Sequence, residues 1–224
     1  MSLAEALEKL GAAHVARACK PDTLDQIEQA IKDLPQKRAG VRITANAGLD
    51  PIISTTGAIG LLAARVLGPM AKPVRAILFD KSAASNWALG WHQDRVIVVK
   101  QRHSAPGFGP WTIKAGLHHV APPFWLLEAM VTIRIHLDPV TADNAPLLVA
   151  LGSHRLGLVA ETDVDPVVAT SEIHQCLAER GDAWLYATPI LHASARSTAV
   201  SRRRVLQIDY CAENLPGGLE WLGI

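Results

Sequence analysis

The sequence predicts a mainly β fold, a jelly roll of two packed sheets with helices lying on one of them. Helical periodicity is concentrated in residues 1–70, and from Val74 onward the chain breaks mainly into short β-rich segments separated by turn residues. Several helices followed by six or more strands favour this layered architecture. The 224 residues, 49% of them hydrophobic, suffice for a substantial core. We therefore expect a single domain over 1–224, with a helical front (1–70) and a jelly-roll core (74–212).

Three helices are expected in the front segment. Ser2 has the form of a capping-box residue at the start of the first. The second begins near Thr23 and ends before Pro35, and the third covers 56–69. None of them gathers reactive groups on one face, so all three are expected to pack against the core. A further helix is expected at 171–180, after the serine that opens it.

Six strands are expected in the core, and two of them carry a polar face. Side chains two residues apart on a strand point to the same side. A polar face is either solvated surface or the lining of a wet cavity, and a cavity is favoured because both faces would meet near the metal-capable segments described below. The strands are 74–79, 95–100, 130–138, 145–151, 182–188 and 203–211; the polar faces are Arg203, Gln207 and Asp209 in the last strand, and Thr132, Arg134 and His136 in the third.

Composition excludes several classes of function. A net charge of +1 argues against a broad nucleic-acid footprint. No apolar run approaches the roughly 20 residues that span a bilayer, and the N-terminus lacks the layout of a signal peptide. Cys19, Cys176 and Cys211 form no C-x-x-C pair, which is typical of buried thiols in a reducing compartment. We expect a cytoplasmic globular protein, monomeric or homodimeric, that binds no nucleic acid or membrane.

The stretch GWHQD (90–94) places two metal-capable side chains at the mouth of an apolar strand. His92 and Asp94 share one side of an extended chain, so they can converge on one ion. A lone His-x-Asp is a weak signal that needs a third ligand from elsewhere.

Among the nine histidines, His192 stands out because it opens the segment that leads into the last strand. Surface, packing or hydrogen-bonding roles are expected for His14 on the first helix, His103 in a loop, His154 in a turn and His174 on the late helix, while His118 or His119 is a candidate to line a pocket.

Three stretches together resemble the phytanoyl-CoA dioxygenase family of Fe(II)/2-oxoglutarate oxygenases. They are WHQD (91–94), NAPLLVALGSHRLG (144–157) and LHASARSTAVSRRRVLQIDY (191–210). The family pattern is His-x-Asp, a strand and turn written NGPL…PGSH, and a distal His followed eleven residues later by a basic residue. The resemblance runs from about Phe79 to Tyr210, and FDKSAASNWALGWHQD resembles a bacterial branch of unassigned function. It implies a double-stranded β-helix core, cupin-like and of jelly-roll form, together with Fe(II), 2-oxoglutarate and O₂.

The resemblance also implies the ligands. His92, Asp94 and His192 match the facial triad of two histidines and one carboxylate, which leaves three positions for 2-oxoglutarate and O₂. Arg203, eleven residues after His192, matches the anchor of the distal carboxylate of 2-oxoglutarate, and a guanidinium can hold a carboxylate by two parallel hydrogen bonds. Ser194 matches a hydroxyl that assists this anchor.

Further positions match less directly. Trp111 lies about where relatives place a tryptophan beside the cosubstrate. Two departures concern turn geometry: Ala145 replaces the glycine of NGPL, and Leu151 replaces the proline of PGSH. Related halogenases have a small residue at the carboxylate position, so Asp94 indicates hydroxylation.

The predicted reaction is hydroxylation of a C–H bond in a small soluble metabolite, with release of succinate and CO₂. Arg134, Arg95 and His119 are candidates to bind the substrate, although a salt bridge to a neighbouring acid is an equal explanation for Arg134. Two alternatives stay open. One is a jelly-roll protein that uses another metal, such as a zinc hydrolase or isomerase, which has no use for Arg203 and Ser194; the other is a non-catalytic jelly-roll binding protein.

Overall fold

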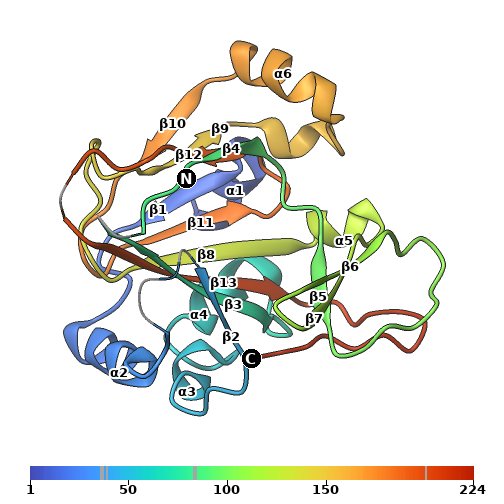
Figure 1. The fold of residues 1–224 in the computed structure, drawn as a ribbon, viewed down its shortest axis with the longest axis horizontal. Helices are drawn as coiled ribbons and strands as arrows, with labels where there is room; N and C mark the ends of the chain where they lie inside the picture. The colour runs from blue at the N-terminus through green and yellow to red at the C-terminus, as the bar shows by residue number, and fades with distance from the viewer. Residues whose placement is uncertain (36–37, 39, 83–84, 200) are drawn as a thin grey trace.

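The computed structural model describes residues 1–35, 38, 40–82, 85–199 and 201–224, and three antiparallel sheets form its frame (Figure 1). The six-stranded sheet has the order β1 (Ala12–Val15), β11 (Ala183–Ala187), β8 (Met130–His136), β13 (Arg203–Cys211), β3 (Lys72–Lys81) and β2 (Gly40–Ile43). The four-stranded sheet has the order β10 (Ile173–Cys176), β9 (Leu147–Ala150), β12 (His192–Ser194) and β4 (Leu89–His92). The third sheet contains β5 (Ile97–Val99), β7 (Leu117–Val120) and β6 (Trp111–Lys114).

The two larger sheets pack face to face, as the jelly-roll prediction requires. Trp184 and Tyr186 of the six-stranded sheet share a buried apolar cluster with Leu147, Val149 and Cys176 of the four-stranded sheet. The mainly β jelly roll is therefore confirmed. All six expected strands are present, most of them shortened at their ends, as β3, β5, β8, β9, β11 and β13.

The N-terminal helices cover the outer face of the six-stranded sheet. They are α1 (Leu3–Leu10), α2 (Pro21–Ile31), α3 (Asp50–Ile53) and α4 (Gly60–Leu67). Ile133 and Ile135 of β8 are fully buried in the cluster that these helices form, and Figure 1 shows α2, α3 and α4 on one side of the sheet with the four-stranded sheet on the other. Because neighbouring residues on a strand alternate in direction, Thr132 and Arg134 point between the two sheets.

Local signals explain how α1 begins and ends. The Ser2 hydroxyl accepts a hydrogen bond from the Glu5 backbone N–H, and the Glu5 carboxylate accepts one from the Ser2 backbone N–H. Gly11 ends the helix in the left-handed region with φ of 79°. The chain then turns directly into β1, which pairs with β11.

Two expectations about secondary structure were wrong. The front segment is not purely helical, because β1 and β2 lie within it and extend the six-stranded sheet at both edges; His14 therefore lies on β1.

The helix expected at 171–180 is absent. Ser171 closes α6 (Val164–Thr170), where its hydroxyl donates to the Val167 carbonyl at 2.8 Å, and the next residues form β10, because pairing with β9 outweighs their helix propensity. His174 therefore lies on β10 and not on a helix. The remaining elements are α5 (Phe124–Glu128) and the 3₁₀ turns Ser153–Leu156 and Glu161–Asp163. His154 lies in the first of these turns, as expected.

The cysteines are buried, as the sequence predicts. Cys19, Cys176 and Cys211 are buried free thiols. None of the helices in the described part of the chain has the length and apolar character needed to cross a bilayer.

The two departures from the family pattern have local explanations. The backbone N–H of Leu151 donates to the Glu172 carbonyl at 2.9 Å, a hydrogen bond that proline could not make. Ala145 has φ of 51°, in the left-handed region where glycine is favoured.

Replacing Ala145 by glycine is expected to stabilise the protein by about 1 kcal/mol, because glycine adopts the left-handed conformation without the steric cost of a Cβ atom. The free energy of unfolding, measured by urea denaturation, checks this. Ala4→Gly on the exposed side of α1 is the matched control and should destabilise by about 1 kcal/mol. A loss of stability in Ala145→Gly as large as that of the control would contradict the backbone argument.

Candidate active site

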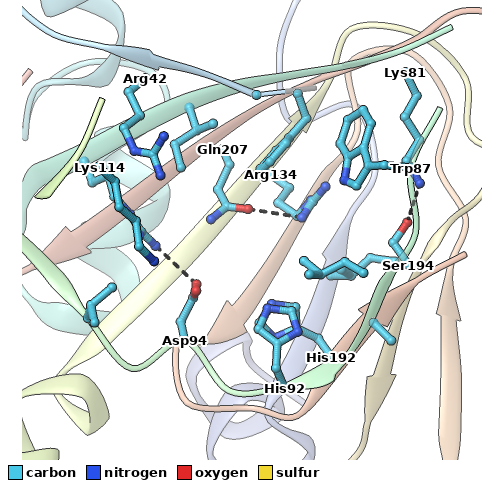
Figure 2. Close-up of a pocket in the computed structure, with 18 of the residues that line it drawn as sticks. Arg42, Lys81, Trp87, His92, Asp94, Lys114, Arg134, His192, Ser194 and Gln207 are labelled. Carbon is cyan, nitrogen blue, oxygen red and sulfur yellow. Dashed lines mark hydrogen bonds and ion pairs between the residues drawn. The ribbon is translucent and has the colours of Figure 1, made fainter. Parts of the chain in front are cut away.

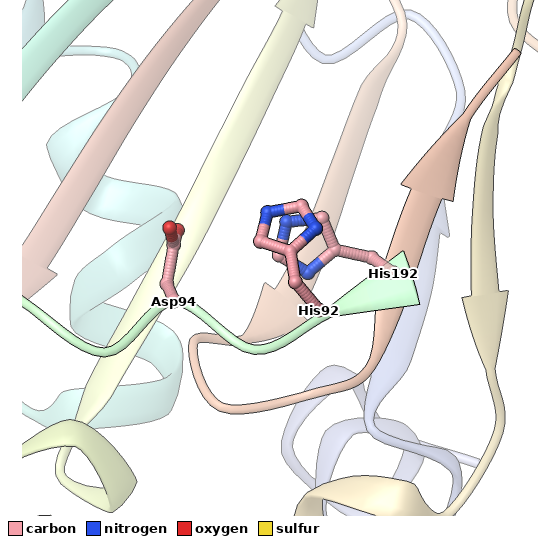
Figure 3. A group of neighbouring side chains, drawn as sticks. All are labelled: His92, Asp94 and His192. Carbon is pink, nitrogen blue, oxygen red and sulfur yellow. The ribbon is translucent and has the colours of Figure 1, made fainter. Parts of the chain in front are cut away.

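The β4–β12 ladder brings two histidines together. His92 and His192 are direct partners across this ladder, and their ring centroids are 4.3 Å apart. Asp94 follows His92 by two residues, just beyond the end of β4 (Figure 3). One potential ligand atom from each of the three side chains lies within 4.8 Å of the others. The structure therefore gathers the three expected metal ligands at one point.

Backbone carbonyls orient both imidazoles. The Nδ1 atom of His92 lies 2.8 Å from the Gly90 carbonyl oxygen, and the Nδ1 atom of His192 lies 2.9 Å from that of Ile190. A carbonyl can only accept, so each Nδ1 carries a proton and each Nε2 is the nitrogen that can bind a metal. Burial lowers the pKa of His192 to about 4, so this imidazole is neutral at physiological pH, as a metal ligand must be.

Arg75 holds the carboxylate of the triad. Its Nη2 atom lies 3.2 Å from Oδ2 of Asp94, and its Nε donates to the buried carboxylate of Asp209. Burial acts to raise the pKa of Asp94, but Arg75 and the two histidines outweigh it and hold this pKa below its usual value. The other carboxylate oxygen is left for an ion. Two imidazole nitrogens and one carboxylate oxygen fit the ligand set expected for Fe(II).

Replacing Arg75 by lysine is expected to weaken metal binding about tenfold or more. Lysine keeps the positive charge that the buried carboxylates need, but a single ammonium cannot orient Asp94 and Asp209 as the planar guanidinium does. Competition between Co(II) and a chromophoric chelator measures the change in Kd. Arg65→Lys, an exposed position on α4, is the control. An unchanged Kd in Arg75→Lys would show that the arginine does not position the ligand.

A cavity of about 330 Å³ opens beside the triad, between the two larger sheets (Figure 2). Its charge is strongly positive. Six basic side chains line it, whereas Asp94 is the one acidic side chain among the described lining residues. The basic residues are Arg42, Arg75, Lys81, Lys114, Arg134 and Arg203; Ile77, Phe79, Trp87, Leu89, Val96 and Leu147 supply most of the apolar wall.

Arg203 lies deep in this cavity and is only 2% exposed. It donates to the Ala145 carbonyl, which also accepts from the Ser194 hydroxyl at 3.2 Å. Its two neighbours are engaged in ion pairs: Arg202 with Asp80 and Arg204 with Asp138, each at 2.7 Å. Of the three consecutive arginines, Arg203 therefore lines the cavity beside Ser194, whereas Arg202 and Arg204 do not line it.

Lys81 completes this part of the cavity, although it was not among the site residues expected from the sequence. It is the cross-strand partner of Arg203, is 1% exposed, and donates to the Ser194 hydroxyl at 3.0 Å. Burial, Arg203 and Arg134 lower the pKa of Lys81 to about 7. No carboxylate among the described residues forms an ion pair with any of these three cations. The alternation of Arg75, Ile77, Phe79 and Lys81 along β3 was the signal that could have revealed it.

The affinity for 2-oxoglutarate is expected to fall as pH rises through 7. A dianion beside Lys81 favours the charged ammonium, so binding raises its pKa and takes up a proton. With a pKa of about 7 before binding, the charged fraction falls from about one half at pH 7 to about one tenth at pH 8, and Kd should rise about fivefold. Calorimetry in two buffers of different ionisation enthalpy measures both effects. Lys81→Arg keeps its charge and should bind equally at both pH values; a flat profile in the wild-type protein would contradict the role of Lys81.

The remaining predicted site residues divide into two pairs. Arg134 and His119 line the cavity. Arg134 donates to Gln207 at 3.1 Å and lies 5.2 Å from the centre of the Phe79 ring, and no salt bridge to an acid is found for it within the described chain.

Arg95 and Trp111 lie outside the cavity. Arg95 donates to the Val159 carbonyl at 2.6 Å and lies 3.6 Å from Glu161. Trp111, on β6, packs beside the apolar cluster under the third sheet. The tryptophan that does line the cavity is Trp87, whose ring centre lies 5.0 Å from the Lys81 ammonium.

A jelly roll that carries two oriented histidines and a carboxylate beside a cationic cavity defines a non-haem metalloprotein. The chain belongs to the phytanoyl-CoA dioxygenase (PhyH) family, whose model matches residues 7–205. Membership of this family confirms the expected class of oxidoreductase and its reactants: iron(II), 2-oxoglutarate and O₂. No curated protein matches the sequence.

Solved structures share the fold at low sequence identity. EctD from S. alaskensis, in its apoform, is 18% identical with a TM-score of 0.68, and the match covers 100% of this chain and 81% of that chain. SnoK, a non-heme alpha ketoglutarate dependent carbocyclase from nogalamycin biosynthesis, is 13% identical with a TM-score of 0.69, covering 100% of this chain and 88% of that chain. AviO1 from Streptomyces viridochromogenes Tue57 is 18% identical with a TM-score of 0.64, covering 93% and 92%.

Proposed function

We propose that this protein hydroxylates a C–H bond of a small metabolite in an Fe(II)-dependent reaction that converts 2-oxoglutarate to succinate and CO₂. One observation carries the proposal: the free ligand atoms of His92, Asp94 and His192 open into the same cavity as Arg203, a buried cation without a carboxylate partner in the described chain. A metal site and a carboxylate anchor in one cavity are what the chemistry of this family requires.

The residues of the chain divide the work. His92, Asp94 and His192 would hold iron(II), and Arg203 with Ser194 and Lys81 would bind the distal carboxylate of 2-oxoglutarate. Iron and 2-oxoglutarate, when bound, supply the activation of O₂ and the electrons for it. The reaction requires no side chain to act as an acid or a base. The protein contributes orientation, charge and an apolar wall that limits access of water.

Two features support hydroxylation of a small substrate. The position that family halogenases leave small is occupied by Asp94, which lies within reach of both histidines. The cavity of about 330 Å³ is at the lower end of the range for ligand pockets, roughly 300–1,000 Å³. A zinc hydrolase would have no use for Arg203 and Ser194, and a non-catalytic binding protein would have no use for the intact triad of His92, Asp94 and His192.

Anaerobic titration of the apoprotein with Fe(II) and 2-oxoglutarate tests the proposal without knowledge of the substrate. The expected result is a visible metal-to-ligand charge-transfer band that requires both components. Fe(II) alone and 2-oxoglutarate alone are the controls. A substrate screen that follows 2-oxoglutarate consumption and product mass would then show whether oxygen is inserted. Tight Zn(II) binding without the charge-transfer band would overturn the proposal.

A further inference from the structure

The basic residues of the cavity form two groups. Lys81, Arg134 and Arg203 surround the predicted position of the 2-oxoglutarate carboxylate. A second group, Arg42 on β2 and Lys114 on β6, lines another part of the cavity; in the view of Figure 2 it lies to the left, Lys81 lies to the right, and Arg134 lies near the middle above His92 and His192. Strand register separates Arg42 from Lys81 and Arg203 along the sheet, whereas Arg134 is level with Arg42 but lies three strands away, on β8.

The register gives the distance along the sheet. Arg42 is paired with Ile77 of β3, whereas Arg203 is paired with Lys81, four residues further along the same strand. Four residues of extended chain span roughly 13 Å. One dicarboxylate anchored at Arg203 and turned toward the triad is therefore not expected to occupy the second group as well.

The second group has no charge partner in the described chain. Neither Arg42 nor Lys114 forms an ion pair with an acid there. Arg75, which lies close to Arg42, is already engaged with Asp94 and Asp209. Two like charges that face one cavity repel each other unless an anion joins them.

One buried donor and one buried acceptor beside these charges are also unsatisfied. The Nε atom of Arg42 is buried without a hydrogen-bond partner. His119 is 1% exposed, and its Nδ1 lies 3.0 Å from the Leu117 carbonyl, which can only accept, so Nδ1 carries the proton and the lone pair on Nε2 is buried without a partner. Burial and the nearby charges of Arg42, Arg75 and Lys114 lower the pKa of His119. Unsatisfied buried polar atoms are rare in folded proteins because each one destabilises the fold, and a bound ligand can remove that cost.

Iron(II) and 2-oxoglutarate do not need the positive charges of Arg42 and Lys114. Iron(II) contributes +2, Asp94 −1 and 2-oxoglutarate −2, a sum of −1 that Lys81, Arg134 and Arg203 already offset. Arg42 and Lys114 therefore remain available for another negative charge, and the substrate is the reactant still to be placed.

We propose that the substrate carries an oxyanion, a carboxylate or a phosphate, which binds Arg42 and Lys114 at the end of the cavity away from Arg203. This inference rests on the proposed function, since it takes the triad as the reacting centre. The oxyanion fixes one end of the substrate, so the C–H bond to be oxidised lies a short chain away from it, over the triad.

Calorimetric titration with sulfate and with acetate tests the second anion site. The protein is loaded with Ni(II), which takes the place of iron, and with saturating 2-oxoglutarate, so that Arg203 is occupied. We expect each wild-type molecule to bind one further anion, and Arg42→Gln and Lys114→Gln each to weaken that binding about tenfold or more. Arg42→Lys should recover part of the affinity, and the exposed Arg65→Gln on α4 should bind as the wild type does. A preference for sulfate indicates a phosphate substrate, and a preference for acetate a carboxylate.

The outcomes separate this inference from the proposed function. If 2-oxoglutarate binds the Ni(II)-loaded protein but neither anion does, or if both bind Arg42→Gln as tightly as the wild type, the second anion site is wrong and the proposed function stands. If 2-oxoglutarate itself fails to bind, the proposed function falls, and the assignment of a substrate site falls with it.

Discussion

Replacing Arg203 by alanine is expected to weaken 2-oxoglutarate binding by a factor of roughly 30 to several thousand. Loss of one partner from a buried, hydrogen-bonded charge pair costs about 2–5 kcal/mol, and about 1.4 kcal/mol corresponds to a factor of ten in Kd. Arg203 is 2% exposed, so solvent screens its interaction with the carboxylate only weakly. Calorimetric titration of the metal-loaded protein with 2-oxoglutarate gives the two Kd values.

The adjacent arginines provide matched controls. Arg202 and Arg204 are ion-paired with Asp80 and Asp138 outside the cavity, so Arg202→Ala and Arg204→Ala should leave the Kd for 2-oxoglutarate within about threefold. Loss of binding in one of these variants, with binding retained in Arg203→Ala, would show that the register of β13 is wrong by one residue.

Replacing Asp94 by alanine is expected to weaken Fe(II) binding more than 100-fold. Loss of a residue that only supports a ligand costs roughly 10–100-fold in metal affinity, and Asp94 is itself the anionic member of the triad. The substitution also leaves Arg75 with a single carboxylate partner, Asp209. Anaerobic competition with a chelator measures the change, and the exposed Asp165→Ala on α6 is the control. An Asp94→Ala protein that binds Fe(II) as tightly as the wild type would refute the ligand assignment.

Local patterns predicted those parts of the fold that local interactions determine. The capping box at Ser2 marked α1 correctly, and alternation along residues 130–138 and 203–211 assigned their polar faces to the inside of the molecule. The helix expected at 171–180 shows the limit of this approach. Its sequence suits a helix, but the observed conformation depends on pairing with β9, a partner that lies more than twenty residues earlier in the chain.

The same limit applies to the site. Resemblance to the family selected His92, Asp94, His192 and Arg203, because each has a fixed distance along the chain from another motif residue. Lys81 has no such marker, since it becomes part of the site only through the pairing of β3 with β13. Arg42, Arg75 and Trp87 likewise reach the cavity from segments whose spatial neighbours the sequence pattern does not state.

The pairing of β4 with β12 has a consequence for the stability of the whole molecule. His92 and His192 are one hundred residues apart along the chain but face each other across this short ladder. An ion held by both is a cross-link that closes a long loop, and it stabilises the folded chain by about 2.7 kcal/mol when its free concentration is a hundred times its Kd. Pairing of β4 with β12 and binding of the ion are then linked equilibria, because each favours the other. The supply of iron to the cell would govern how long the protein survives as well as how fast it works.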